Sequence, residues 1–418
     1  MVRRLMGFAE RHSGALGLTL LALVIGLRIA AYWVLGAPPE SDGLAYLAMA
    51  KAMAAGGWPV DNFGQHAFYS VGYPLLLAPV FALFGASVPV AVGVNILLAL
   101  WCALLLRAVV RELGLPAWAS LLGMALYALW LPGIWNATML ARENLSTPLL
   151  LLILLYALKI AHNVRPWRSA WMAGLAYGCA LLAGGSALLL IGAPLLALAL
   201  WSGWSLRAML TPAALLLMGV LLVLAPWCVA TTAMLGQPVL NTNGGFNLYL
   251  GNNPAATGSF VSIKDTPAGD VWENMRADMG EVEASATLGR AARHYMRDNP
   301  VRTAELAAVK LARFWQPNVP DAADFAQSKL VSTIRWGEVM QFGLILLLGL
   351  CGLLWGGSAR GDRWLLAATV GGYWAIHAAA YIIMRYRDPV MPVLIIALVL
   401  LLAGRWSHQP RWSARTQG

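Results

Sequence analysis

Long stretches without any charged residue are the feature that most restricts how this chain can fold. Asp, Glu, Lys and Arg are absent from four runs, namely 67–106, 113–141, 169–206 and 208–263. Since about 20 apolar residues are enough for a helix to cross a bilayer, each run has room for at least one crossing. Charged residues make up only 11% of the chain, against about 25% in a soluble domain. The runs predict an all-α membrane protein with many transmembrane helices.

The hydropathy pattern predicts about ten spanning helices and one short helix that does not cross. This short piece, 72–84, contains two prolines and is too short to span comfortably, so we expect a re-entrant or interfacial helix. The first span is too long for a cleaved signal sequence and is expected to remain as an anchor. The expected spans are 15–35, 87–106, 115–134, 144–161, 169–184, 186–202, 209–233, 338–357, 364–384 and 388–404.

Basic residues indicate which side of the membrane each loop faces. With ten spans and both termini inside, Lys and Arg are frequent in the short cytoplasmic segments and scarce in the short outer ones. The net charge of +10 is therefore a topology signal, since no soluble domain with a basic face for nucleic acid is visible. The basic residues of the short outer segments are Lys51, Arg142, Arg385 and Arg387.

Two outer segments are long enough to build a site. The first is the loop 36–70, in which an apolar face predicts a short helix at 43–55. The second contains two helices of mixed charge, near 271–298 and 300–315, and is expected to form a helical cap on the membrane domain. The expected domains are an N-terminal transmembrane module at 1–234, an extracytoplasmic helical cap at 235–337, and C-terminal transmembrane helices with a basic cytoplasmic tail at 338–418.

Asp42 is the candidate catalytic residue. It follows the first expected span and precedes the expected helix of the first loop. The structural alternative is a helix N-cap, because an Asp side chain there accepts a hydrogen bond from the first free backbone amides. A cap can still direct a carboxylate into a cavity, and carboxylates in membrane clefts are often functional. Both interpretations stay open from the sequence alone.

Arg385 and Arg387 lie on the side where positive charge is scarce, and they flank Tyr386 between the last two expected spans. The structural alternative is anchoring at the membrane interface, with an ion pair to Asp388. Two guanidinium groups at one membrane edge also suit a bound phosphate, which arginine binds through two parallel hydrogen bonds. We favour the phosphate and take both arginines as candidate ligands of a donor phosphate.

Several other polar residues are candidates, and each has a structural alternative. Arg142 and Glu143 begin the fourth expected span, where they could form no more than an ion pair. Arg28 lies inside the first span and either has a function or extends to the interface. His377 is expected to be a hydrogen-bonding core residue, since the histidines show no metal-ligand spacing. The candidate substrate-binding residues are Tyr46, His66, Tyr69, Arg142, Glu143, Asn252, Asn253 and Tyr386.

Short motifs spread over nearly the whole chain resemble the GT-C superfamily of glycosyltransferases, which use polyprenyl-phosphate sugars. Asp42 with Tyr46 resembles the acidic motif of that family's first loop. Glu40-Ser-Asp42 stands where the family has an adjacent Asp-Glu pair, which leaves open whether a divalent metal is bound at Asp42. The other motifs are 68–76 (FYSVGYPLL) with 83–85 (LFG), 141–145 (ARENL), 247–254 (NLYLGNNP) with 257–258 (TG), 310–315 (KLARFW) and 385–392 (RYRDPVMP).

The resemblance implies an enzyme that moves a sugar from a polyprenyl-phosphate donor to an acceptor hydroxyl of a glycan, lipid or protein, with inversion. Asp42 would remove the acceptor proton. Arg385 and Arg387 would hold the departing phosphate. The resemblance also implies a multi-pass protein of a bacterial inner membrane whose active site faces the periplasm.

Two other functions remain compatible with the sequence. A transporter or lipid-linked-sugar flippase would have inverted repeats and broken helices around a midplane site. The break at Gly184-Gly185 suits that function as well as an enzyme, but no repeat is evident and the long outer segment favours an enzyme. A glycan polymerase or ligase would share the lipid-linked donor and would transfer an oligosaccharide in place of one sugar.

Overall fold

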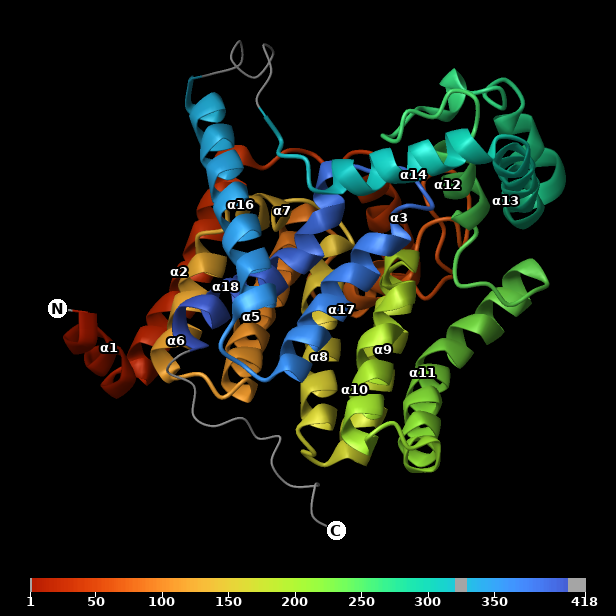
Figure 1. Cartoon of the computed structure of the whole chain (residues 1–418). Helices are drawn as coiled ribbons and strands as arrows, with labels where there is room; N and C mark the ends of the chain where they lie inside the picture. The colour runs from red at the N-terminus through yellow and green to blue at the C-terminus, as the bar shows by residue number, and fades with distance from the viewer. Residues whose placement is uncertain (1, 320–328, 405–418) are drawn as a thin grey trace.

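A computed structural model describes residues 2–319 and 329–404 of the chain. Every regular element among them is a helix, apart from an isolated bridge between Ser259 and Ile382. The all-α prediction is therefore confirmed. Long helices run side by side in a bundle, and helices α12, α13 and α14 lie at one end of it (Figure 1). The expected basic tail after residue 404 lies outside the described residues.

The helices follow one another with short connections except around the cap. Their bounds are α1 Val2–Arg11, α2 Ser13–Leu35, α3 Asp42–Ala54, α4 Gly72–Phe84, α5 Val88–Glu112, α6 Ala117–Ala128, α7 Leu131–Asn136, α8 Glu143–Ala161, α9 Pro166–Ala183, η1 Gly185–Ile191, α10 Gly192–Ser202, α11 Leu206–Leu235, α12 Gly244–Gly251, η2 Ile263–Asp265, α13 Trp272–Asp298, α14 Pro300–Phe314, α16 Lys329–Trp355, α17 Arg360–Ile376, η3 Met384–Val390 and α18 Met391–Ala403.

Seven helices among the described residues have the length and apolar composition needed to cross a membrane, and each coincides with an expected span. The chain is thus a multi-pass membrane protein. Two expected spans differ from the observed helices. The span at 115–134 is broken, because α6 ends at Ala128 and Pro132 begins the separate helix α7. The span at 364–384 is too long, since α17 ends at Ile376. The total of ten spans stays a prediction.

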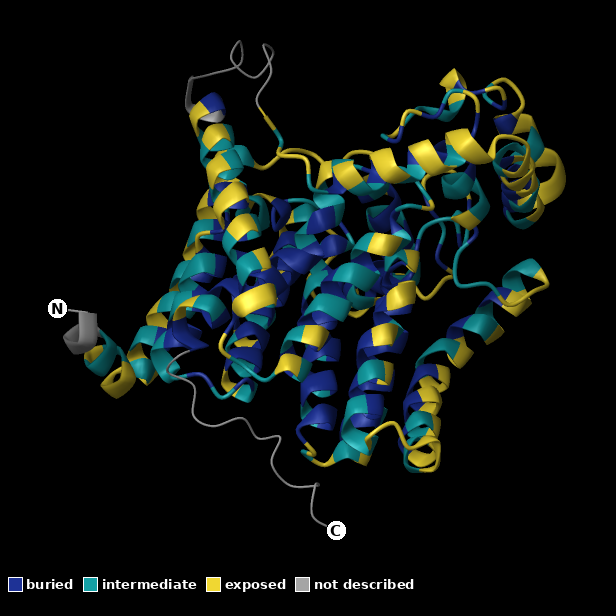
Figure 2. Cartoon of the chain, viewed as in Figure 1, coloured by how far each residue is buried: buried dark blue, intermediate teal, exposed yellow. Residues whose placement is uncertain are grey.

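Glycines allow two pairs of long helices to approach closely. A Cβ atom on Gly174 of α9 would overlap the carbonyl group of Leu216 in α11. A Cβ atom on Gly352 of α16 would likewise overlap the backbone of Ala397 in α18. Small residues at such crossings let helix backbones pack together in the lipid, where apolar surfaces alone give little reason to associate. Almost every residue of α18 is buried, whereas α2, α11 and α16 have large apolar side chains that are exposed (Figure 2).

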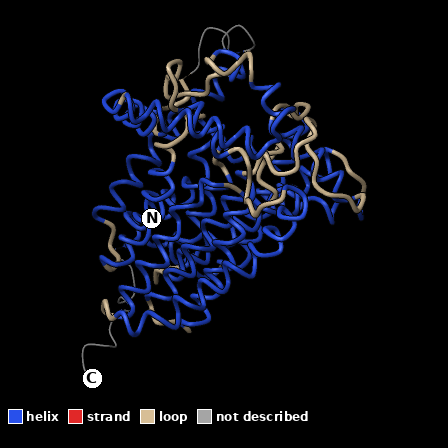
Figure 3. The backbone as a smooth tube through the Cα atoms, turned by 90° about the vertical axis from the view of Figure 1, so that its right-hand side faces the viewer, coloured by secondary structure: helices blue, strands red, loops and turns tan. Residues whose placement is uncertain are grey.

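Residues 235–319, which we call the cap segment, are joined to the loop 36–70 by a buried carboxylate. Glu281 of α13 accepts hydrogen bonds from the backbone amides of His66 and Ala67, at 3.1 and 3.3 Å, and from the Thr242 hydroxyl at 3.0 Å. Phe246 and Trp272 pack around Phe68 beside this carboxylate, and Figure 3 shows the longer loops gathered at the same end. The loop that carries Asp42 is therefore held in one conformation by the cap segment.

Candidate active site

Some of the residues predicted to carry chemistry meet at the end of the bundle that the cap segment covers. Asp42 is the first residue of α3, and Ser41 is the residue before it, so the carboxylate is not the helix N-cap. It accepts a hydrogen bond from the Arg385 guanidinium, Nη2 to Oδ2, at 2.5 Å. Arg385 belongs to η3, 343 positions further along the chain. The fold thus places together two residues that the sequence analysis assigned to proton removal and phosphate binding.

Glu143 completes this group from a third element. Its Oε2 atom lies 3.7 Å from Nε of Arg385, so that the guanidinium sits between two carboxylates. Neither of these two atoms has a hydrogen-bond partner among the described residues, although both are buried. Glu143 is almost fully buried, whereas about a quarter of the Arg385 side chain and a third of the Asp42 side chain are exposed. The group is therefore open on the Asp42 side and has unused donor and acceptor capacity.

Arg142 adds a second positive charge to the group. Its Nε atom lies 3.6 Å from Oε1 of Glu143, and its guanidinium carbon lies 5.9 Å from the ring centre of Tyr386. A Cβ atom on Gly184 would lie 2.6 Å from the Arg142 guanidinium, so a larger residue there would displace this side chain. The Arg142–Glu143 pair predicted as a structural ion pair is present, and Glu143 also faces Arg385.

Arg387, the other predicted phosphate ligand, lies elsewhere. Its guanidinium is buried, donates to the Gln316 carbonyl oxygen, and lies 4.0 Å above the ring centre of Phe342. The carboxylate of Glu338 is 3.9 Å away. These contacts connect η3 to α16 and to the end of the cap segment. The phosphate-binding role of Arg387 stays a prediction, and its contacts favour a structural role.

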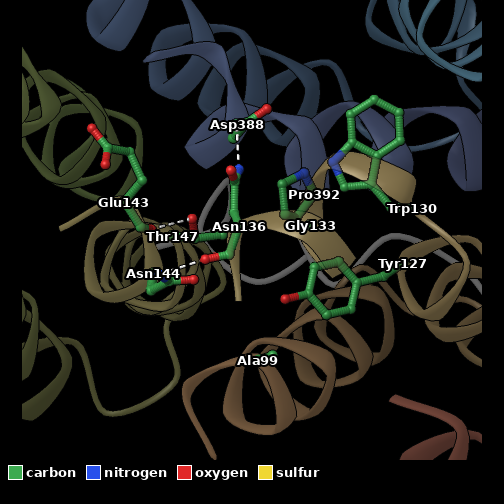
Figure 4. A pocket seen from close by; sticks show the side chains of 10 residues that line it. All are labelled: Ala99, Tyr127, Trp130, Gly133, Asn136, Glu143, Asn144, Thr147, Asp388 and Pro392. Carbon is green, nitrogen blue, oxygen red and sulfur yellow. Dashed lines mark hydrogen bonds between the residues drawn. The ribbon is translucent and has the colours of Figure 1, made fainter. Parts of the chain in front are cut away.

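A small polar cavity of about 30 Å³ lies beside Glu143. Figure 4 shows Asn136 pointing its amide at the Asp388 carboxylate, to which it donates a hydrogen bond. Tyr127 and Trp130 close the opposite wall. A cavity of this size has room for one or two water molecules and not for a sugar. The cavity is therefore too small to be the substrate site. A substrate must bind on the exposed side of Asp42.

Aromatic rings form the wall next to Asp42. The ring of Tyr46 makes edge-to-face contacts with Tyr69 and Tyr73, with centre distances of 5.8 and 5.6 Å. Burial raises the pKa of Tyr46 well above its usual value, and burial likewise raises the pKa of Tyr69. Both hydroxyl groups therefore remain protonated at neutral pH and can donate hydrogen bonds.

Three predicted substrate-binding residues are engaged in holding the backbone. His66 donates from Nδ1 to the Pro59 carbonyl oxygen at 2.8 Å. Asn252 donates from its amide to the carbonyl oxygens of Leu248 and Ala379, each at 2.8 Å, and Asn253 donates to Tyr249. Both asparagines are almost fully buried. Their predicted contact with substrate is untested, and the geometry shows that they bind their own chain.

Arg28 and His377 can also be placed. Arg28 is fully buried, donates to the Val24 carbonyl oxygen and lies 5.2 Å from the ring centre of Tyr127, so it does not extend to the interface. His377 is buried and bonded through Nδ1 to the Tyr373 carbonyl oxygen at 2.7 Å, as expected for a core residue.

Sequence comparison matches the chain to no family model and to no curated protein. Its structure, however, is similar to solved structures of membrane glycosyltransferases. The oligosaccharyltransferase AglB from Archaeoglobus fulgidus in the apo form matches with a TM-score of 0.56 and 12% identity, over 94% of this chain and 51% of that chain. AglB in complex with an inhibitory peptide and a dolichol-phosphate matches with a TM-score of 0.53 and 13% identity, over 94% and 50%. The chain has the GT-C fold.

A third solved structure, ArnT from Cupriavidus metallidurans bound to undecaprenyl phosphate, matches with a TM-score of 0.46 and 14% identity, over 92% of this chain and 77% of that chain. AglB and ArnT are both GT-C glycosyltransferases. This chain spans about half the length of AglB. The two AglB structures show the fold alone, and the activity of this chain is a proposal.

One AglB structure is a complex with Zn and sulfate, which raises the question of a metal in this GT-C fold. Within residues 2–319 and 329–404, no group of three His, Cys, Asp or Glu side chains could hold a metal ion. Asp42 and Glu143 are the two carboxylates at the site, and the Arg385 guanidinium occupies the space between them. The residues present therefore do not fit a divalent metal, and we derive no step through one.

The sequence analysis overlooked three residues that build this end of the GT-C fold: Asn95, Asn136 and Glu281. Asn95 accepts a hydrogen bond from the Tyr73 hydroxyl at 2.7 Å and donates to the carbonyl oxygens of Ala137 and Met139. The signal was present, because Asn95 is a polar residue inside an otherwise apolar run. Nothing in the sequence pattern distinguishes Glu281 from the exposed carboxylates of α13.

Proposed function

We propose that the chain is a membrane glycosyltransferase that moves a sugar from a polyprenyl-phosphate donor to an acceptor hydroxyl, with inversion at the anomeric carbon. One observation carries the proposal: within a GT-C fold, the Asp42 carboxylate and the Arg385 guanidinium meet at 2.5 Å at the capped end of the bundle, and both are partly exposed. A proton acceptor and a phosphate ligand are the two groups that such a transfer requires, and the site supplies both.

Asp42 acts as the general base. The acceptor oxygen attacks the anomeric carbon while its proton passes to the Asp42 carboxylate, and the bond from that carbon to the donor phosphate oxygen breaks. Attack from the side opposite the departing phosphate inverts the configuration. The hydrogen bond from Arg385 holds Oδ2 of the Asp42 carboxylate in place for this step.

Arg385 stabilises the departing polyprenyl phosphate. Its guanidinium has five N–H donors, and one of its nitrogens, Nε, has no hydrogen-bond partner among the described residues. Arg385 can therefore donate hydrogen bonds to a phosphate whether its contact with Asp42 is kept or lengthened. Charge-assisted bonds to a leaving group that gains negative charge strengthen as the reaction proceeds, which lowers the barrier. Arg142 and Glu143 hold Arg385 in place from the side.

The distribution of basic residues supports a site on the extracytoplasmic face. Lys159, Arg165, Arg168, Arg207 and Arg360 lie in or beside the connections at the opposite end of the bundle, whereas the cap segment and the loop 36–70 lie at the Asp42 end. Short cytoplasmic loops are the ones enriched in Lys and Arg. The polyprenyl chain of the donor would lie in the bilayer beside the bundle. By this argument the protein works on the outer side of a bacterial inner membrane.

The proposal is tested by transfer with purified protein in lipid nanodiscs. Lipid-linked sugars extracted from the source cells serve as the donor pool, and mass spectrometry measures both loss of sugar from the lipid and gain of mass on added acceptors. Asp42→Asn is the test variant. Glu40→Gln is its matched control, since Glu40 is an exposed carboxylate two residues away. We expect transfer by the wild type and by Glu40→Gln and none above background by Asp42→Asn.

The same experiment distinguishes the other functions. A gain of one sugar supports the proposal as stated, and a gain of several sugars in one step identifies a ligase or oligosaccharyltransferase. The latter outcome has a structural basis, because solved structures similar to this chain include oligosaccharyltransferases. Movement of intact lipid-linked sugar across the membrane, without transfer to any acceptor, would show a flippase and would overturn the proposal.

A further inference from the structure

The segment that leads into Arg385 has no regular structure of its own. α17 ends at Ile376 and η3 begins at Met384, and we call residues 378–383 the strap. All of it lies within the span that the hydropathy pattern predicts at 364–384. A stretch of chain without regular structure leaves its backbone groups to find partners elsewhere. The amides of Ala378 and Ala379 bond back to the end of α17, whereas the carbonyl groups of these two residues and the amide of Ile382 have partners in the cap segment.

Lys310 of α14 binds the start of the strap. Its ammonium donates to the Ala378 carbonyl oxygen at 3.2 Å and to Oδ1 of Asn252 at 3.0 Å. The side chain is fully buried, and burial lowers the pKa of Lys310 to about 8. The Ala378 carbonyl follows the C-terminal end of α17, where carbonyl groups lack helical partners and the helix dipole favours a positive charge. Lys310 of α14 therefore caps the C-terminal end of α17, which is the helix that precedes Arg385.

Asn252 binds the next residue of the strap. Its amide donates to the Ala379 carbonyl oxygen at 2.8 Å while its Oδ1 accepts from Lys310. The neighbouring Gly251 lies flat against Ala380, since a Cβ atom there would come within 2.6 Å of the Ala380 carbonyl group. Lys310 and Asn252 therefore form one buried hydrogen-bonded unit that holds two successive carbonyl groups.

A third contact holds the far end of the strap. The Ile382 amide donates to the Gly258 carbonyl oxygen at 3.0 Å, which is the bridge noted above, and Arg313 of α14 donates to the hydroxyl of Ser259 at 2.6 Å. Arg385 is three residues beyond Ile382. The cap segment therefore binds the strap at both of its ends. The strap leads directly to Arg385, whose guanidinium pairs with Asp42.

We propose that Lys310 and Asn252 are positioning residues that set the placement of Arg385 against Asp42 and against the donor phosphate. The donor part of this inference rests on the proposed function, whereas the structural part does not. Neither residue touches the reacting groups; both act through the strap. A buried hydrogen-bonded unit whose members all have partners holds one geometry, and the loss of one member leaves the others without partners. The cap segment is then a functional part of the site and not only a cover.

The structural part is tested by hydrogen–deuterium exchange on the full-length protein in nanodiscs. Lys310→Met removes the ammonium and keeps the length of the side chain. Lys264→Met is the matched control, because Lys264 is an exposed lysine of the same cap segment. We expect faster exchange of the amides at 379–386 in Lys310→Met alone. Unchanged exchange there would overturn the inference. If Lys310→Met does not fold, Lys310→Gln, which retains one donor, is measured in its place.

The donor part is tested by titration with undecaprenyl phosphate. We expect Lys310→Met to bind the phosphate roughly tenfold more weakly than wild type, which is the loss expected when one charge-assisted hydrogen bond is misplaced. Lys310→Arg should restore part of the affinity. In an Arg385→Ala background, Lys310→Met should have no further effect, and an equal effect in both backgrounds would overturn action through Arg385. If the wild type binds no undecaprenyl phosphate, the proposed function fails, while the exchange experiment still decides the role of Lys310 in the strap.

Discussion

The two ends of the membrane bundle each contain one nitrogen cation between two carboxylates, and the two groups differ in how completely they are bonded. At the capped end, Arg385 lies 2.5 Å from Asp42 and 3.7 Å from Glu143. At the opposite end, His162 lies 2.9 Å from Glu112 and 2.7 Å from Asp362. His162 is almost fully buried and both of its ring nitrogens are bonded, whereas the Arg385 group is partly exposed and holds unpaired atoms.

This difference separates a group that stabilises the fold from a group that can do chemistry. The His162 group joins α5, α8 and α17, and each ring nitrogen has a carboxylate partner at hydrogen-bond distance. A buried network that is fully bonded keeps its three helices in register and offers nothing to a ligand. The Arg385 group leaves donor capacity and an exposed carboxylate at the surface of a GT-C fold, as a site for a substrate must.

The largest expected effect is at Asp42. Asp42→Asn keeps the shape of the side chain but cannot accept a proton, and the loss of a positioned base costs about 10²–10⁴-fold in rate. Because the ion pair with Arg385 is partly exposed, the melting temperature should change little. Transfer rate and thermal unfolding measured on the same preparation check both statements. Retention of substantial transfer would remove Asp42 as the base.

His162 should behave in the opposite way. His162→Leu removes the cation shared by the buried Asp362 and the partly buried Glu112, and breaking such a group costs up to about 3–5 kcal/mol of stability. Thermal unfolding in nanodiscs measures this loss, and transfer measured well below the melting temperature should stay near the wild-type rate. A full loss of transfer in folded His162→Leu would show that the two ends are coupled and would contradict the comparison.

The pH dependence of the protein's stability should report the protonation of His162. Burial by itself lowers the pKa of His162, but hydrogen bonds to Asp362 and Glu112 outweigh burial and raise the pKa to about 9. A raised pKa in the folded state stabilises the fold fully below the unfolded value of about 6.5, and this contribution is lost as the pH rises through about 9. The loss is on the order of 3 kcal/mol. Melting curves between pH 6 and 10 should show it in wild type and not in His162→Leu.

The smallest expected effects separate Arg385 from Arg387. Arg385→Ala should weaken binding of undecaprenyl phosphate by about 10–100-fold, the range for one lost hydrogen bond to a charged group, with little change in stability. Arg385→Lys should recover only part, because lysine cannot form two parallel bonds. Arg387→Ala should instead lower the melting temperature, since it removes the hydrogen bond to the Gln316 carbonyl and a cation that lies next to Glu338. Equal loss of phosphate binding in the two alanine variants would restore the prediction that both arginines bind phosphate.

Local patterns of the sequence predicted the elements of this fold well. The loop helix expected at 43–55 is α3, and the helices expected at 271–298 and 300–315 are α13 and α14. Such elements depend on apolar periodicity, capping and proline placement, all of which are local in the chain. The expected span at 364–384 failed for a non-local reason, because the strap leaves the helix to bind Lys310 and Asn252.

By itself the sequence determined that this is an all-α membrane protein, and it named Asp42, Arg385 and Arg387 as the residues most suited to chemistry. Only the tertiary structure decided that Asp42 and Arg385 meet across 343 positions, and that Arg387 does not join them. The reason is geometric. η3 is a 3₁₀ helix with about three residues per turn, so side chains two positions apart point in different directions. Arg385 therefore faces the carboxylates, and Arg387 faces α16. The charges counted along the chain do not reveal this difference.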